Sequence, residues 1–290
     1  MAASLALLVA FCIGGHSLSR AEERIAVIAA ENFYGDIVRQ IGGDRVSVAS
    51  ILSRPDQDPH FFEAAPSVAR RIDEARLIVS NGAGYDGWMD KLIAASSRKN
   101  RMIISAAAEV GHKPGDNPHI WYNPAAMPVV TTAIAEALMR SDPSHADEYT
   151  KRLKATLGSL SRISRRVAEL RMRYAGIAVT ATEPVFGPMA DALGLAMRNQ
   201  RFQLAVMNNT EPSARDMAGI ENDLKGRKVR VLIYNAQVSS KTGERLRALA
   251  THYNIPTVGV TETMPPHLSF QDWQLRQLDA LELALGRPGS

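Results

Sequence analysis

The chain has 290 residues, of which 46% are hydrophobic, 22% charged and 6% aromatic, so it carries enough apolar material for one large core or two smaller ones. Its net charge of +4 is mildly basic, and the basic residues are scattered among acidic ones apart from an arginine-rich stretch at 162–173. A nucleic-acid-binding face needs a denser basic stripe, so we expect no nucleic acid as a partner.

The first residues predict a secretion signal. The apolar run Ser4–Gly14 is too short to span a bilayer, and small residues precede a cleavage point after Ala21. We therefore expect residues 1–21 to be a cleaved signal peptide and the mature protein to be periplasmic; a buried N-terminal helix is the alternative. The single cysteine, Cys12, lies inside this segment and is not expected to be a lipidation site. The mature chain would then have neither disulfides nor thiolate metal ligands.

Short apolar strands alternate with helical patterns over the first part of the mature chain. Strands are expected at Arg24–Ala29, Val46–Leu52, Leu77–Ser80 and Met102–Ser105, and helices at Phe33–Ile41, Pro66–Glu74 and Tyr85–Ser96. This βαβα order predicts a mostly parallel sheet flanked by helices. We assign it to an N-terminal lobe of residues 22–140, which ends in a helical stretch at Pro124–Met139.

A long helix is expected from Pro143 to Tyr174, because the segment has few helix breakers and Pro143 suits a first helical turn. Some thirty residues of helix would be about 45 Å long, so we interpret 141–174 as a rigid connector. Beyond it the βαβα order resumes in a C-terminal lobe, residues 175–290. Its strands are expected at Gly176–Ala181, Val229–Tyr234 and Thr257–Val260, and its helices at Ser213–Leu224, Ser240–Tyr253 and Phe270–Leu285.

Four loops that follow predicted strands carry a residue able to bind a metal ion: His60, His119, Glu183 and Glu262. Open α/β sheets bind ligands just beyond the carboxyl ends of their strands. Two imidazoles and two carboxylates, two from each lobe, would therefore close around one cation. A proline before each histidine restrains the local backbone. Each residue alone is typical of an exposed or structural side chain, so the prediction rests on the set.

Several motifs together resemble the metal-binding solute-binding proteins of ABC importers for manganese, zinc and iron. They are Asp58-Pro59-His60, Pro118-His119-x-Trp121-x-x-Pro124, the stretch Thr182–Gly187, Glu211-Pro212-Ser213, Ile233–Gln237, Val260-Thr261-Glu262 and the Trp273 helix. The resemblance implies an α/β fold of two lobes, each a mostly parallel sheet flanked by helices, joined by one long rigid helix. It also implies a monomer that delivers its metal to a permease in the cytoplasmic membrane with its ATPase.

The family's ligand positions match His60, His119, Glu183 and Glu262 of this chain. Many zinc members have histidine at the third position and many manganese members have glutamate, as here. The fourth is usually aspartate, so the longer Glu262 leaves a water or His267 as alternatives. Imidazole suits zinc, iron and manganese, while carboxylates favour harder ions. The transported ion is therefore expected to be Mn²⁺, Zn²⁺ or Fe²⁺, with the choice among them open.

Other functions are less well supported by the sequence. Four protein ligands close off a cation as in non-catalytic sites, so we expect no enzyme; the alternative is a secreted zinc-dependent hydrolase that uses one carboxylate as general base. The stretch Gly82–Gly87 matches a dinucleotide-binding pattern, but it follows the third strand and is interpreted as a glycine turn that opens a helix. A carrier of an organic solute would need an aromatic-lined pocket, which the low aromatic content does not favour.

Overall fold

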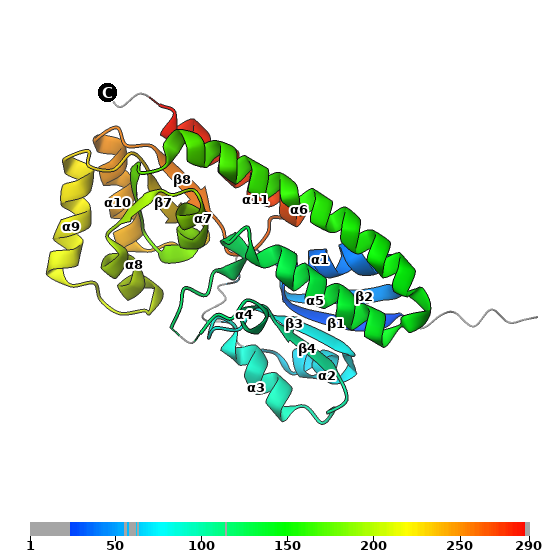
Figure 1. Cartoon of the computed structure of the whole chain (residues 1–290). Coiled ribbons are helices and arrows are strands. Elements are labelled where there is room, and N and C mark those ends of the chain that lie inside the picture. Colours follow the sequence, from blue (N-terminus) through cyan, green and yellow to red (C-terminus); the bar gives the residue numbers. More distant parts are fainter. Residues whose placement is uncertain (1–23, 55–56, 58–61, 63, 114, 288–290) are drawn as a thin grey trace, which may run out of the picture.

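The computed structural model describes residues 24–54, 57, 62, 64–113 and 115–287. Two four-stranded parallel sheets form the two lobes, in the orders β2-β1-β3-β4 and β6-β5-β7-β8 (Figure 1). The strands are β1 Ile25–Glu31, β2 Val46–Leu52, β3 Leu77–Ser80, β4 Met102–Ser105, β5 Ala178–Ala181, β6 Ala196–Arg198, β7 Leu232–Asn235 and β8 Thr257–Val260. The predicted fold class, two α/β lobes joined by a long helix, is confirmed.

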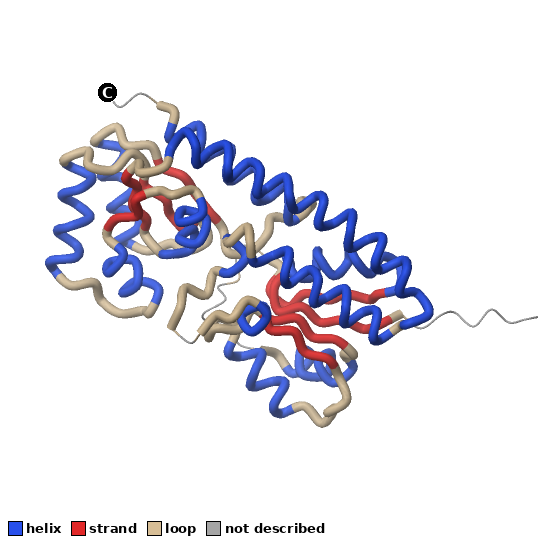
Figure 2. Tube along the Cα trace, viewed as in Figure 1, coloured by secondary structure: helices blue, strands red, loops and turns tan. Residues whose placement is uncertain are grey.

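Helices flank both sheets, and loops fill the region between them (Figure 2). The α-helices are α1 Asn32–Gly42, α2 Pro66–Glu74, α3 Gly87–Ala95, α4 Ala106–Glu109, α5 Ala126–Ser141, α6 Ala146–Tyr174, α7 Gly187–Ala192, α8 Gln200–Met207, α9 Ala214–Lys225, α10 Lys241–His252 and α11 Phe270–Leu285. Short 3-10 turns lie at η1 Gly43–Arg45, η3 Ile120–Tyr122, η4 Pro143–His145 and η5 Pro184–Phe186. Every described strand pairing is parallel, so each connection must cross over through such an element.

The central strand of the first lobe is apolar on both faces. Val27 and Ala29 of β1 pack into the main core, whereas Ile28 and Ala30 face a second core that contains residues of α2 and α3. Parallel sheets covered on both sides read as continuous hydrophobic runs, which is why this strand is recognisable in the sequence. The covering helices leave only the ends of the strands open for polar side chains.

The helix α6 has 29 residues and is therefore about 44 Å long at 1.5 Å per residue. Figure 1 shows it running alongside both lobes, with α11 beside it. Ile163, Val167 and Leu170 follow helical spacing and are all buried. Arg166 forms ion pairs with Asp279 and Glu282 of α11, so the two helices are also tied at their exposed edges.

The sequence did not predict one strand and three α-helices that the structure contains: β6, α4, α7 and α8. The strand β6 has three residues, lies at the sheet edge and exposes its first and last residues, so no apolar alternation marks it. The helix α8 follows Asn199, whose left-handed φ of 58° carries the turn out of β6. The strand expected at Val229–Tyr234 is shifted, because β7 begins only at Leu232.

Candidate metal site

His119 lies directly before η3, in the loops beyond β4, and its side chain is only 1% exposed. Its Nδ1 lies 2.7 Å from Oδ1 of Asn117. That oxygen also accepts the backbone N–H of His119, and the amide nitrogen of Asn117 donates to the carbonyl of Pro184, so the oxygen is the acceptor in the ring contact as well. In the neutral imidazole, Nδ1 is therefore the nitrogen that carries the proton, and Nε2 has the lone pair that a metal ion requires.

Glu262 follows β8 in the second lobe and is also almost completely buried. Its Oε2 lies 3.5 Å from Nε2 of His119 and accepts a hydrogen bond of 2.9 Å from the Tyr85 hydroxyl. Its Oε1 accepts one of 2.6 Å from the side-chain amide of Asn235. Burial, and next the nearby charge of Glu262, raises the pKa of Tyr85 well above its usual value, which keeps this hydroxyl a donor. The carboxylate is thus held at the junction of both lobes.

Glu183 follows β5 and precedes η5, and it is partly exposed. Its Oε2 accepts a hydrogen bond of 3.1 Å from the same Asn235 amide nitrogen that binds Glu262. The two carboxylates of the second lobe are therefore linked through one neutral donor.

The fourth predicted ligand, His60, lies outside the described residues, as do Asp58 and Pro59 before it. Among the residues that are described, no three His, Cys, Asp or Glu side chains lie close enough to hold a metal ion. Within that part, the structure brings His119 and Glu262 together and joins Glu183 to them through Asn235. His267 is exposed, so Glu262 is the residue that meets His119.

Aromatic rings gather beneath the site although the chain is poor in them. The ring of His119 meets Trp121 at 5.2 Å and Tyr85 at 5.8 Å between centroids, both edge-on. Trp121 in turn contacts Phe33, which also contacts Trp273 of the second lobe. This packing fixes the imidazole in a water-poor environment, where its interaction with a charge is strengthened.

Side-chain amides and carboxyls dock the lobes next to the site. Asn32 donates to the carbonyl of Met264 (2.7 Å) and accepts its N–H (2.9 Å). Asp36 accepts the backbone N–H of Phe270, and Tyr122 donates to the carbonyl of Thr261 at 2.7 Å. The loop that bears Glu262 is thus attached to the first lobe through the backbone on both sides of that residue.

Two buried acids lie below the first-lobe loops. Glu31 is fully buried at the end of β1, and neither of its carboxyl oxygens has a hydrogen-bond partner among the described residues. Burial, with a contribution from Asp86, raises the pKa of Glu31 well above its usual value. Burial also raises the pKa of Asp86 to about 6, although the backbone N–H groups of Gly82 and Asn81 donate to it.

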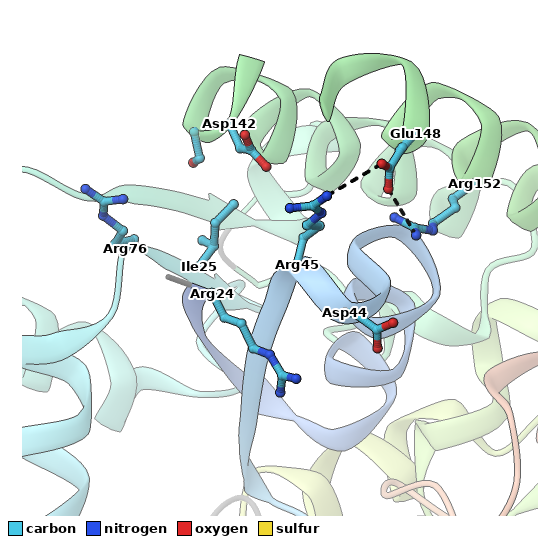
Figure 3. A pocket seen from close by; sticks show the side chains of 9 residues that line it. Arg24, Ile25, Asp44, Arg45, Arg76, Asp142, Glu148 and Arg152 are labelled. Atoms are coloured by element: carbon cyan, nitrogen blue, oxygen red, sulfur yellow. Dashed lines mark ion pairs between the residues drawn. The ribbon is translucent and has the colours of Figure 1, made fainter. Parts of the chain in front are cut away.

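A separate hollow of about 530 Å³ lies by the opposite ends of β1, β2 and β3 (Figure 3). Its arginines are interleaved with acids: Glu148 pairs with Arg45 at 3.8 Å and with Arg152 at 3.3 Å. The charges largely compensate one another, and none of the predicted ligands lines it.

Sequence reasoning missed three residues that organise the site: Tyr85, Asn117 and Asn235. Tyr85 lies in the Gly82–Gly87 stretch, and the prediction of a glycine turn before a helix is confirmed, since Gly82 has φ 75° and α3 begins at Gly87. Asn117 lies two residues before His119. Asn235 belongs to the stretch Ile233–Gln237, which in the sequence contributed only to the family resemblance. No spacing rule marks any of them as a partner of a ligand.

A protein-family model described as zinc-uptake complex component A, periplasmic (ZnuA), matches residues 27–284. The chain belongs to this family. The resemblance to metal-binding solute-binding proteins of ABC importers is thereby confirmed over nearly the whole described chain.

Individual relatives agree with the family assignment. The manganese ABC transporter substrate-binding lipoproteins PsaA of Streptococcus anginosus and Streptococcus pneumoniae are 28% and 29% identical over 171 and 188 residues, which is 54% and 58% of this chain. These alignments span 55% and 60% of the relatives' own length.

Solved structures share the fold of this ZnuA-family chain. The periplasmic zinc-binding protein TroA of Treponema pallidum has a TM-score of 0.78 at 19% identity, covering 91% of this chain and 100% of TroA. The protein FpvC of Pseudomonas aeruginosa, in a structure with Mn²⁺, has a TM-score of 0.74 at 21% identity, covering 92% and 100%. Both likenesses support the two-lobe architecture.

Proposed function

We propose that this ZnuA-family protein captures a divalent transition metal ion between its two lobes and delivers it to an ABC importer. The observation that carries the proposal is the buried pair of His119 and Glu262, which come from different lobes and lie 3.5 Å apart. An imidazole with a free Nε2 lone pair facing a carboxylate is a metal-binding arrangement, and a cation there would bridge the lobes.

The proposed ligands are His60, His119, Glu183 and Glu262, and the proposed cargo is Mn²⁺, Zn²⁺ or Fe²⁺. Two imidazoles and two carboxylates suit all three ions. The names of similar proteins point in more than one direction, with manganese for PsaA and zinc for TroA.

The test is the metal content of the protein isolated from its native compartment, measured by mass spectrometry of the elements. One equivalent of manganese, zinc or iron per chain is expected. Metal-free protein that also takes up none of the three in calorimetry would contradict the function. Tight zinc binding in vitro alone would not assign the cargo, because intrinsic affinity rises from manganese to zinc in most sites.

The proposed partners are a membrane permease and its ATPase, and the proposed location is the periplasm, after cleavage of residues 1–21. Within the described residues, no helix has both the length and the apolar character to cross a bilayer. The similar PsaA proteins are named lipoproteins. The intact mass of the exported protein separates free release after Ala21 from lipid attachment at Cys12.

We propose that the chain is a monomer with no enzymatic activity. Family membership and the similarity to transport proteins favour transport over the zinc-hydrolase alternative. Turnover of ester or peptide substrates by the zinc-loaded protein, lost in His119→Ala, would contradict this part of the proposal.

A further inference from the structure

A hollow of about 780 Å³ lies at the amino ends of β7 and β8, whereas Glu262 follows the carboxyl end of β8. Three of the residues that line it are arginines, namely Arg227, Arg230 and Arg287. None of the described residues that line it is Asp or Glu. The hollow is therefore separate from the candidate metal site and opposite to it in charge.

The chain segments around this hollow are basic in the sequence itself. The segment 225–231, which leads into β7, contains four Lys or Arg residues, and the segments 249–257 and 283–287 contain no Asp or Glu, as 225–231 also does not. The hollow at the amino ends of the first-lobe strands has four arginines and three acids among its lining residues. Charge is thus balanced at this end of the first lobe and one-sided at this end of the second.

The acids in the last two turns of α11 face away from the hollow. Asp279 and Glu282 both pair with Arg166 of α6, and Glu282 also pairs with Arg173. Neither acid lines the hollow. The one-sided charge is therefore not relieved by the helix that forms one of its walls.

Arg230 is fixed without being neutralised. Its guanidinium donates to the backbone carbonyls of Leu285 and Arg287, at 3.4 and 3.2 Å. The helices α9, α10 and α11 all end beside the hollow, and each helix end carries about half a negative charge. Three such ends offset only about half of the charge of three guanidinium groups.

Arg227 has a backbone conformation that glycine adopts more readily. Its φ is 50°, in the turn after α9 where its N–H bonds to the carbonyl of Leu224. This left-handed region is unfavourable for a residue with a Cβ atom. Strained residues persist where the surrounding structure requires them, and they are frequent at binding sites. The arginine side chain is thus placed in the hollow at a cost to the turn.

The wall beside the arginines is apolar. Val229 and Ile255 are buried there, and Leu283 lies at the hollow with 74% of its surface exposed. A guanidinium group matches the oxygens of a phosphate group, to which it can donate two parallel hydrogen bonds. An exposed leucine next to such donors suits an apolar substituent on the same ligand.

We propose that this hollow binds the phosphate group of an amphiphilic phosphate ester, either within a membrane or free in solution. Arg227, Arg230 and Arg287 hold the phosphate, and Leu283 contacts the apolar substituent. The inference does not depend on metal capture, because the hollow and the metal site lie at opposite ends of β8.

The test uses the purified protein at low ionic strength. Co-sedimentation is measured with vesicles of phosphatidylcholine and with vesicles that also contain phosphatidylglycerol, and calorimetry is done with a soluble short-chain phosphatidylglycerol. Binding to the anionic vesicles assigns the ligand to a membrane, and binding to the soluble ester alone assigns it to solution. Added salt should weaken either interaction. No binding to either anionic probe, or equal binding to the neutral vesicles, would overturn the proposal.

Two substitutions locate the binding site. Arg227→Gly removes one guanidinium and suits the left-handed backbone, so stability should stay close to wild type. Arg287→Gln removes another. Each should weaken binding of the anionic probe by about fivefold. The matched control is Arg76→Gln, which removes an exposed arginine from the first-lobe hollow and should bind as wild type does.

Equal weakening in Arg76→Gln would indicate a general attraction of charge and would contradict the assignment to this hollow. Unchanged binding in both Arg227→Gly and Arg287→Gln would also refute it. The affinity for Zn²⁺, measured by calorimetry, should be unchanged in all three variants. Failure of this inference therefore leaves the proposed metal capture standing, and failure of metal capture leaves this inference standing.

Discussion

The two lobes repeat one sheet, with the first strand of each in second place, and they supply equivalent positions to the site. His119 follows β4 and Glu262 follows β8, which are the corresponding edge strands in the orders β2-β1-β3-β4 and β6-β5-β7-β8. These two residues are also the pair that meets across the lobes, at 3.5 Å. Equivalent strand ends thus carry chemically different ligands to a common point.

The asparagines beside the third strand of each sheet show how differently those ligands are held. Asn81 follows β3 and donates to the carbonyl of Pro118 at 2.8 Å, so it fixes the His119 loop through the backbone. Asn235 ends β7 and donates to the carboxylates themselves. An imidazole needs only its loop and one acceptor to be oriented, whereas a carboxylate has two equivalent oxygens and must be restrained directly.

The acids at the ends of the corresponding strands β1 and β5, Glu31 and Glu183, differ in exposure. Glu31 at the end of β1 is sealed under the first lobe, while Glu183 beyond β5 is partly exposed and joined to Glu262 through Asn235. The same corner of the sheet therefore holds a buried acid with a raised pKa in one lobe and a candidate ligand in the other.

Removing the first-lobe ligand should have the largest effect. His119→Ala is expected to weaken metal binding more than about 100-fold, because it deletes a ligand atom rather than a supporting contact. Calorimetry on the purified variant measures this. His267→Ala removes an exposed imidazole and is the matched control. His60→Ala should behave like His119→Ala; near-native affinity in either variant would remove that histidine from the site.

Neutralising the second-lobe carboxylates should reduce the stabilisation that metal provides. A bound ion stabilises the folded protein by RT ln(1 + [L]/Kd), about 4 kcal/mol at a thousandfold excess over Kd. In Glu183→Gln and Glu262→Gln the metal-induced rise in Tm should be smaller. Each tenfold increase in Kd lowers the stabilisation by bound metal by about 1.4 kcal/mol. An unchanged rise in Glu183→Gln would leave Glu262 as the only carboxylate ligand of this lobe.

Substitution of the buried acid Glu31 should have the smallest effect. The effect is on the stability of the metal-free protein, and it depends on pH. The pKa of Glu31 is raised in the folded state, so the folded protein binds more protons than the unfolded chain above the ordinary carboxyl range, about pH 4.3. The free energy of unfolding contributed by this group therefore falls as pH rises through that window. The substitution Glu31→Gln removes this pH-dependent fall in the free energy of unfolding, because glutamine does not ionise.

Relative to wild type, Glu31→Gln should become progressively more stable as pH rises from about 4.5 to about 8, which appears as a growing difference in Tm. Thermal melts of metal-free protein measure the difference, with the exposed Glu109→Gln as control. Parallel stability curves for wild type and Glu31→Gln would mean that the acid is ionised in the folded state.

Much of the fold was predictable because buried parallel strands and amphipathic helices leave local patterns. The strands Val46–Leu52, Leu77–Ser80, Met102–Ser105 and Thr257–Val260 and the helix Phe270–Leu285 have the predicted bounds. The edge strand β6 was not predicted because it has only three residues, the first and last of which are exposed, so no apolar pattern marks it.

The site was predictable only as far as its chemistry is local. A histidine after proline in a strand-end loop can be recognised, but its partners cannot. The hydrogen bond from Tyr85 to Glu262 joins residues 177 positions apart, and only the folded chain brings them together. Asn235 is likewise a partner of Glu183 only because β7 lies between β5 and β8.

The packing of α11 has a consequence for the order in which the protein can fold. This last described helix lies against α6 and α1, and Asn32 at the start of α1 bonds to Met264, 232 positions later. During synthesis, α1 emerges from the ribosome long before these partners do. Long-range contacts of this kind form late and slow folding. The chain therefore cannot close the seam between its lobes until nearly all of it has been synthesised.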